Sequence, residues 1–116
     1  MQLTVKGRNV PVTEECRELV VRRFDKVARQ VSDLAVMEIE LCAERNPANP
    51  SKYVAEATLY LKGTTLRAKD SSKDMNHAIN LIADEMAVQV KRQRDKRRAR
   101  REARSTVASP EAPPLP

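Results

Sequence analysis

The chain has 116 residues, 41% hydrophobic and 33% charged, which suits one domain with a modest core and tails. It contains no uninterrupted apolar run of the roughly 18 residues that a membrane span needs, and its start, MQLTVKGRN, lacks the apolar stretch of a signal peptide. Cys16, Cys42 and the single histidine, His77, do not have the spacing of a disulfide scaffold or a zinc site. We therefore expect a cytoplasmic protein with no metal or other cofactor.

Alternating apolar residues predict a short strand over residues 2–6, ended by Gly7-Arg8-Asn9. Thr13 followed by Glu14 and Glu15 is typical of a helix start, because the hydroxyl can cap the helix and acids favour the positive end of its dipole. An apolar stripe at helical spacing follows. Its members are Cys16, Val20, Phe24, Val27 and Val31.

Alternation with a period of two predicts two further strands, over residues 36–43 and 53–61, separated by the loop RNPANPSK. Lys62-Gly63-Thr64 predicts a tight turn into a fourth strand, in which Leu66 and Ala68 face inward. We expect strands two to four to form an antiparallel meander with one polar face.

Ser71-Ser72-Lys73-Asp74 is a capping-box pattern that opens a last helix, predicted to run to about residue 104. The core stripe of this helix consists of Met75, Ala78, Ile79, Ile82 and Met86. The order β-α-β-β-β-α predicts a two-layer α+β domain, with two helices on one face of a four-stranded sheet. We assign residues 1–96 to this domain, 97–104 to a basic helical extension and 105–116 to a disordered Pro-rich tail or linker.

Positive charge is concentrated near the C-terminal end of the chain. Residues 1–85 carry 13 basic and 13 acidic side chains, whereas residues 86–104 carry nine basic side chains against Asp95 and Glu102. Such asymmetry points to a polyanionic partner. A membrane surface is the weaker alternative, because beyond Val90 this segment offers only alanines as apolar residues.

A second basic group lies on the first helix. Arg22, Lys26 and Arg29 fall on one exposed row, flanked by Arg23. If the two helices pack side by side, this row and the basic segment share an outer layer. Arg67 and Lys69 on the fourth strand would face away from that layer, and we give them less weight.

The chain lacks the residues of an active site. His77 is best interpreted as a helix residue, and two glycines cannot build a phosphate-cradling loop. We therefore expect neither an enzyme nor a small-molecule substrate. Aromatic residues amount to 3%, too few for a base-stacking platform. The charge pattern favours recognition of the backbone and shape of folded RNA.

Three segments, MQLTVKGRNVPVT, VVRRFDKV and LRAKDSSKDMNHAIN, resemble the ribosome hibernation promoting factor family, also called ribosome-associated inhibitors. The similarity extends from Met1 to about Lys96. It implies the same β-α-β-β-β-α fold and a non-enzymatic factor that binds the small ribosomal subunit in the channel between its head and body. There the factor would compete with tRNA and mRNA and block translation.

The resemblance also implies rRNA-binding residues. On the first helix these are Arg22, Arg23 and Lys26, and near the end of the last helix Lys91, Arg92, Arg94 and Lys96. The charge pattern adds Arg29, Arg97 and Arg98. The chain departs from the family at Asn76-His77, where an aromatic residue is usual, and at Glu85 and Val88, where basic residues are common. A general structured-RNA-binding or RNA-chaperone-like module is the alternative.

Overall fold

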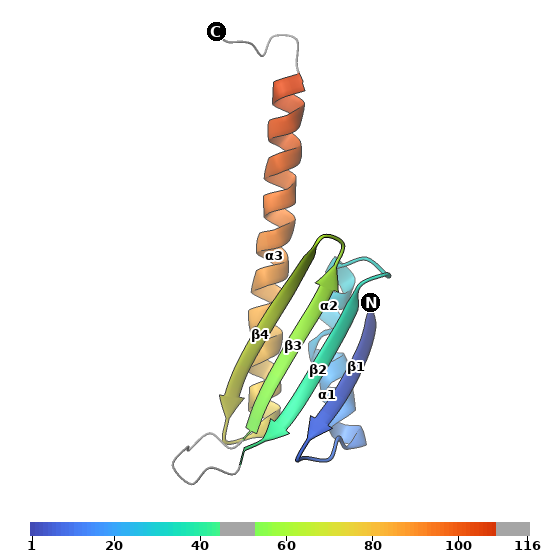
Figure 1. The fold of residues 1–116 in the computed structure, drawn as a ribbon, viewed down its shortest axis with the longest axis vertical. Coiled ribbons are helices and arrows are strands. Elements are labelled where there is room, and N and C mark those ends of the chain that lie inside the picture. Colours follow the sequence, from blue (N-terminus) through green and yellow to red (C-terminus); the bar gives the residue numbers. More distant parts are fainter. Residues whose placement is uncertain (45–52, 109–116) are drawn as a thin grey trace.

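A computed structural model describes residues 1–44 and 53–108, with side chains up to residue 101. The loop predicted at residues 45–52 and the last eight residues lie outside this described part. Four strands form one sheet in the order β1-β2-β3-β4 (Figure 1). They are β1 (Gln2–Arg8), β2 (Val36–Ala43), β3 (Tyr53–Leu61) and β4 (Thr64–Ser72).

The sheet is mixed. β2, β3 and β4 form the predicted antiparallel meander, and β1 lies parallel to β2. β1 extends past its predicted end, and the turn comes at Asn9, whose φ is 60°. Gly7 is required there, because a Cβ atom on it would lie 2.3 Å from the Val10 carbonyl oxygen as the chain folds back.

Three helices cover one face of the sheet and leave the other face open (Figure 1). They are α1 (Glu14–Arg23), α2 (Asp25–Gln30) and α3 (Met75–Ala108). As predicted, Thr13 caps α1, its Oγ1 accepting a hydrogen bond of 3.1 Å from the Cys16 N–H. Within residues 1–44 and 53–108, none of the helices combines the length and the apolar composition of a membrane span.

The first helix is not continuous as predicted, because it breaks at Phe24. The backbone there has φ −91° and ψ 4°, outside helical geometry. Its N–H still donates to the Val20 carbonyl, and its carbonyl accepts from the Ala28 N–H, each at 2.9 Å. The helical spacing of apolar residues therefore continues through the break, which is why the sequence pattern does not reveal it.

The predicted cap of the last helix is wrong by three residues. β4 continues to Ser72, and the Asp74 side chain accepts a hydrogen bond of 3.2 Å from the Asn76 N–H at the start of α3. The Ser72 hydroxyl instead pairs with His77 Nδ1 at 2.8 Å. From Met75, α3 continues for 34 residues, a rise of about 51 Å at 1.5 Å per residue.

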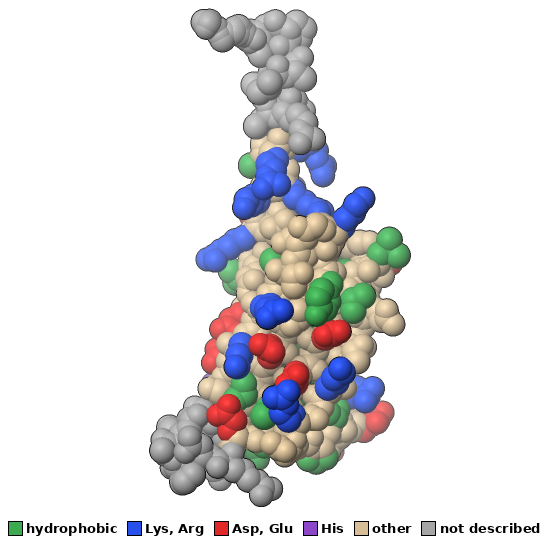
Figure 2. Space-filling model, viewed as in Figure 1, with side chains coloured by type: hydrophobic (Ala, Val, Ile, Leu, Met, Phe, Trp, Pro, Cys, Tyr) green, Lys and Arg blue, Asp and Glu red, His purple; other side chains and the backbone are tan. Residues whose placement is uncertain are grey.

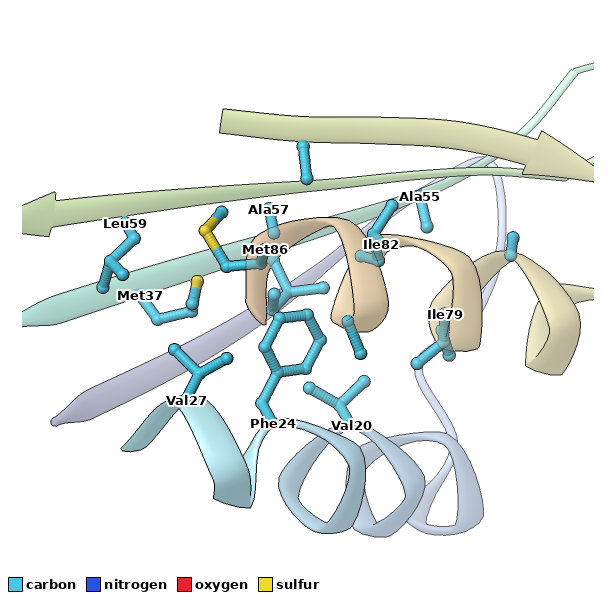
Figure 3. Packing of buried hydrophobic residues seen from close by; sticks show 14 of the residues in the cluster. Val20, Phe24, Val27, Met37, Ala55, Ala57, Leu59, Ile79, Ile82 and Met86 are labelled. Atoms are coloured by element: carbon cyan, nitrogen blue, oxygen red, sulfur yellow. The ribbon is translucent and has the colours of Figure 1, made fainter. Parts of the chain in front are cut away.

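The core lies between the sheet and the helices (Figure 3). Phe24 stands at its centre, 1% exposed. The predicted stripe of α3 is buried throughout, and on the first helix Cys16 and Val31 are only partly buried. The largest buried side chains around Phe24 are Val20 and Val27 on the same helical segment, Met37, Ile39, Leu41 and Leu59 on the strands, and Ile79, Ile82 and Met86 on α3.

Replacing Phe24 by alanine should destabilise the domain by about 3–5 kcal/mol, because it removes a large buried side chain and leaves a cavity. Urea denaturation followed by circular dichroism measures the free energy of unfolding. The control is Val21→Ala on the same helix, where the side chain is 54% exposed and the change should stay within about 0.5 kcal/mol. Equal losses for the two variants would contradict the placement of Phe24 in the core.

Candidate nucleic-acid interface

Charge changes sign along the first helical segment. The first turn of α1 carries Glu14 and Glu15, and its last turn carries Arg22 and Arg23. This order complements the helix dipole, which is positive at the N-terminal end and negative at the C-terminal end. It also concentrates positive charge at the end of α1 that leads into α2.

The predicted row on the first helix is fully accessible. Arg22, Arg23, Lys26 and Arg29 are all exposed. Arg29 forms an ion pair of 2.9 Å with Asp25, one turn earlier. Because Asp25 partly neutralises Arg29, the other three side chains are the stronger anion-binding candidates of this row.

The two basic groups lie toward the same end of the sheet. α1, α2 and α3 all run in the same direction along the sheet (Figure 1), and α3 contacts both α1 and α2. A groove of about 580 Å³ lies where α3 passes the end of the sheet. The side chains that line this end groove come from the segment after α2, from the β3–β4 turn and from one side of α3: Gln30, Val31, Ser32, Leu34, Ala35, Val36, Tyr60, Leu61, Lys62, Val90, Gln93, Arg94 and Arg97. The basic row of the first helix does not line it.

The basic residues of α3 do not form a single ridge. Lys91, Arg92, Arg94, Lys96, Arg97 and Arg98 are all exposed. Arg94 and Arg97 line the end groove, and Arg97 donates a hydrogen bond of 3.2 Å to the Lys62 carbonyl. Arg92 instead lines a shallow groove between α3 and β4. Helical geometry places Lys91 and Arg98 on the side of Arg94, and Lys96 on the side of Arg92.

Arg67 and Lys69 lie closer to the basic segment than the sequence indicates. β4 is an edge strand, and both residues line the same shallow groove as Arg92. The Gln89 amide holds this arrangement by donating a hydrogen bond to the Arg67 carbonyl. A contact between residues this far apart in the chain leaves no sequence pattern, so reasoning from strand alternation underweighted the pair.

The open face of the sheet is mixed in charge. Figure 2 shows acidic side chains among basic ones over the sheet, and basic side chains gathered where α3 extends beyond it. In register across the four strands lie Lys6, Glu40, Glu56 and Lys69. Arg8 forms an ion pair of 3.5 Å with Glu40. This face is a poorer surface for a polyanion than the end of the molecule that carries the basic helix residues.

Glu85 lies in the shallow groove with Arg92. Burial raises the pKa of its carboxyl group, and a hydrogen bond and like-charge repulsion from Asp70 raise that pKa further. Asp70 itself accepts a hydrogen bond of 2.8 Å from the Ser71 N–H. The two acids oppose phosphate binding at this point.

In the described part of the chain, no three His, Cys, Asp or Glu side chains are arranged to hold a metal ion. His77 is exposed at the start of α3, where it pairs with Ser72. The feature that stands out is accessible positive charge at one end of the domain.

Comparison with known proteins identifies the family. Residues 3–98 match the family described as "Sigma 54 modulation protein / S30EA ribosomal protein". The chain belongs to this family. It is 31% identical to the ribosome hibernation promoting factor of Salmonella typhimurium over 95 residues, which cover 82% of this chain and 95% of that protein. The Escherichia coli K12 factor is 30% identical over 95 residues, which cover 82% of this chain and 95% of that protein.

A ribosome hibernation promotion factor from Picosynechococcus is 28% identical over 96 residues, and the chain spans about half the length of that relative. Among solved structures, the N-terminal domain of Thermus thermophilus Protein Y matches with a TM-score of 0.69 and 25% identity over 79% of this chain and 98% of that one. A ribosomal subunit interface protein from Coxiella burnetii shares the fold, with a TM-score of 0.68. It is 20% identical, and the match covers 82% of this chain and 99% of that one. The resemblance found in the sequence and the α+β fold are thus confirmed.

Replacing Glu85 by glutamine should stabilise the domain at pH 7. The raised pKa of Glu85 means that folding disfavours its charged form. Protonated Glu85 therefore favours the folded state of wild type in acid, and this contribution to stability is lost as the pH rises through the pKa of the folded state. Glutamine carries no charge at any pH, so the advantage of the variant should shrink below about pH 4. Thermal denaturation at pH 7 and pH 3.5 measures the difference in melting temperature between the variant and wild type.

Asp84→Asn is the matched control, since Asp84 is the preceding residue of α3 and is exposed. It should change stability little at either pH. A Glu85→Gln variant no more stable than wild type at pH 7, or one equally stabilised at both pH values, would contradict the role assigned to burial and Asp70.

Proposed function

We propose that the protein is a ribosome hibernation factor that binds the small ribosomal subunit through rRNA phosphates in the decoding and tRNA–mRNA channel and sterically blocks translation. One observation carries this proposal. The parallel helices bring the basic end of α1–α2 and the first basic turns of α3 to the same end of one domain. A rigid domain with accessible cations at one end fits a charged RNA channel.

The binding energy would come mainly from phosphate contacts. Each neutralised phosphate releases condensed counterions, so affinity falls as the salt concentration rises. On a plot of the logarithm of the binding constant against the logarithm of salt concentration, each phosphate contact in a duplex adds about −0.9 to the slope. In this proposal residues 1–96 form the ribosome-binding domain, and the basic extension at 97–104 adds phosphate contacts. Arg22, Arg23, Lys26, Lys91, Arg92 and Arg94 are the first candidates, and Arg29, Lys96, Arg97 and Arg98 the second.

Inhibition needs no chemical step. A folded domain in the channel excludes tRNA and mRNA by occupying their space, and charge-assisted hydrogen bonds to phosphates hold it there. This agrees with a non-enzymatic protein that acts on ribosomes in the cytoplasm without a cofactor. The names of the Salmonella and E. coli relatives, which the chain matches over 95% of their length, support the same function.

A general structured-RNA-binding module is the second candidate. The distribution of basic residues around α3 favours it, because a helix that carries cations on several sides can contact phosphates of many RNA shapes. The two functions differ in what supplies specificity: the fit of the domain into one channel, or charge alone.

Reversing the charges of Arg22 and Lys26 to glutamate should weaken binding to small ribosomal subunits at least tenfold at moderate salt, because it replaces attraction to phosphate by repulsion. Cosedimentation of purified protein with subunits at 100–300 mM KCl measures the loss. Both side chains are exposed, so the melting temperature should change little.

The control carries the same change in net charge on other surfaces, as Lys6→Glu with Lys73→Glu, both of which are exposed. This variant should retain most of its affinity. If the two double variants bind equally, net charge alone governs binding and the first-helix assignment is wrong.

Competition separates the two candidate functions. A hibernation factor should be displaced from small subunits by tRNA together with mRNA, and excess folded RNA without ribosomes should compete poorly. The measurement is the bound fraction of labelled protein under each competitor at constant ionic strength. Equal competition by bulk structured RNA would favour the general RNA-binding module.

A further inference from the structure

The end groove contains apolar and amide side chains that phosphate binding does not require. Its floor is apolar, with Val31, Val36 and Leu61 partly exposed at the end of the core. At its rim Leu34 is 90% exposed. Of the four large hydrophobic side chains exposed in the described part of the chain, Leu34 and Tyr60 both line this groove. An apolar concentration of this kind marks a surface that a partner covers.

The polar groups around this floor are of two kinds. The charged residues among its lining are Lys62, Arg94 and Arg97, all cations. Arg97 is tied to the β3–β4 turn through the Lys62 carbonyl, which fixes that part of the rim. Gln30 from the end of α2 and Gln93 from α3 add two side-chain amides, each able to donate and to accept hydrogen bonds.

We propose that the end groove binds an unpaired nucleotide of the RNA, with its base on the apolar floor and its phosphate at Arg94 and Lys62. The amides of Gln30 and Gln93 would contact the base edge. Unpaired bases present both an apolar face and a hydrogen-bonding edge, which bases inside a helix do not offer together. The groove volume of about 580 Å³ falls in the range of about 300–1,000 Å³ common for small-molecule sites.

RNA fits this groove better than an acidic peptide does. The groove is continuous with the basic end of the molecule, since Arg94 belongs to both. The inference rests on the proposed function, because the nucleotide would belong to the RNA that the basic residues bind.

The test uses Leu34→Ser and Gln93→Ala in the full chain, with affinity for small ribosomal subunits measured at several KCl concentrations. Each should weaken binding about fivefold, at the lower end of what one base contact contributes, without changing the salt slope. Arg94→Ala should weaken binding and reduce the slope by about one, as loss of a phosphate contact does. Thr4→Ala is the control, at an exposed side chain of β1 that lines neither groove; it should bind like wild type.

A loss of affinity in Leu34→Ser and Gln93→Ala with unchanged slope supports the nucleotide site. Wild-type affinity in both variants overturns it and leaves the proposed function intact, whereas failure of wild type to bind small subunits removes the proposed function itself. A second measurement identifies the occupant. A photoreactive benzoylphenylalanine at position 34 should crosslink to rRNA in the complex, and adducts confined to ribosomal protein would overturn the proposal.

Discussion

The packing of two parallel helical segments on one face of the sheet is the constraint on which the rest of the structure depends. Phe24, Val20 and Val27 meet the buried stripe of α3 over the sheet (Figure 3). Because β1 and β2 are parallel, the chain must return along the sheet between them, and α1–α2 makes that crossover. α3 comes after β4, turns back along the sheet and runs in the same direction as α1–α2 (Figure 1). Both helical segments therefore point toward the same end of the domain, and α3 extends beyond it.

This arrangement joins helix stability to surface charge. Acids at the start of α1 and bases at its end stabilise it through the dipole. In α3 the last turn carries no basic residue, so its cations are not placed by the dipole. Since the helices are parallel, the bases at the end of α1 and the cations of α3 nevertheless lie toward the same end of the domain. The open sheet face, where Arg8 pairs with Glu40, stays mixed in charge. Local electrostatics and fold topology thus produce the polarity of the surface together.

The sequence predicted what is encoded locally. The periods of two and 3.6 gave the strands, the meander and the buried stripes, and each apolar position on the α3 stripe is buried as expected. It missed the break at Phe24, because helical hydrogen bonds on both sides of the break preserve the apolar spacing. It also missed the cap at Asp74, which depends on the pairing of β4 with β3 up to Ser72. The basic residues were recognisable as a group, but their distribution between two grooves follows from how α3 crosses β4 and the β3–β4 turn.

The distribution of charge also separates affinity from selectivity. Beyond Arg97, which contacts the β3–β4 turn, α3 continues to Ala108, so its cations there can meet phosphates on any side and favour any dense polyanion. Arg22, Lys26 and Arg94, by contrast, are exposed on helical segments whose neighbouring residues Val20, Val27 and Val90 are buried in the core. Charge on a projecting helix increases attraction for all RNA alike, whereas charge on a rigid end discriminates between RNA shapes. We infer that the domain end selects the site and that the projecting part of α3 adds affinity.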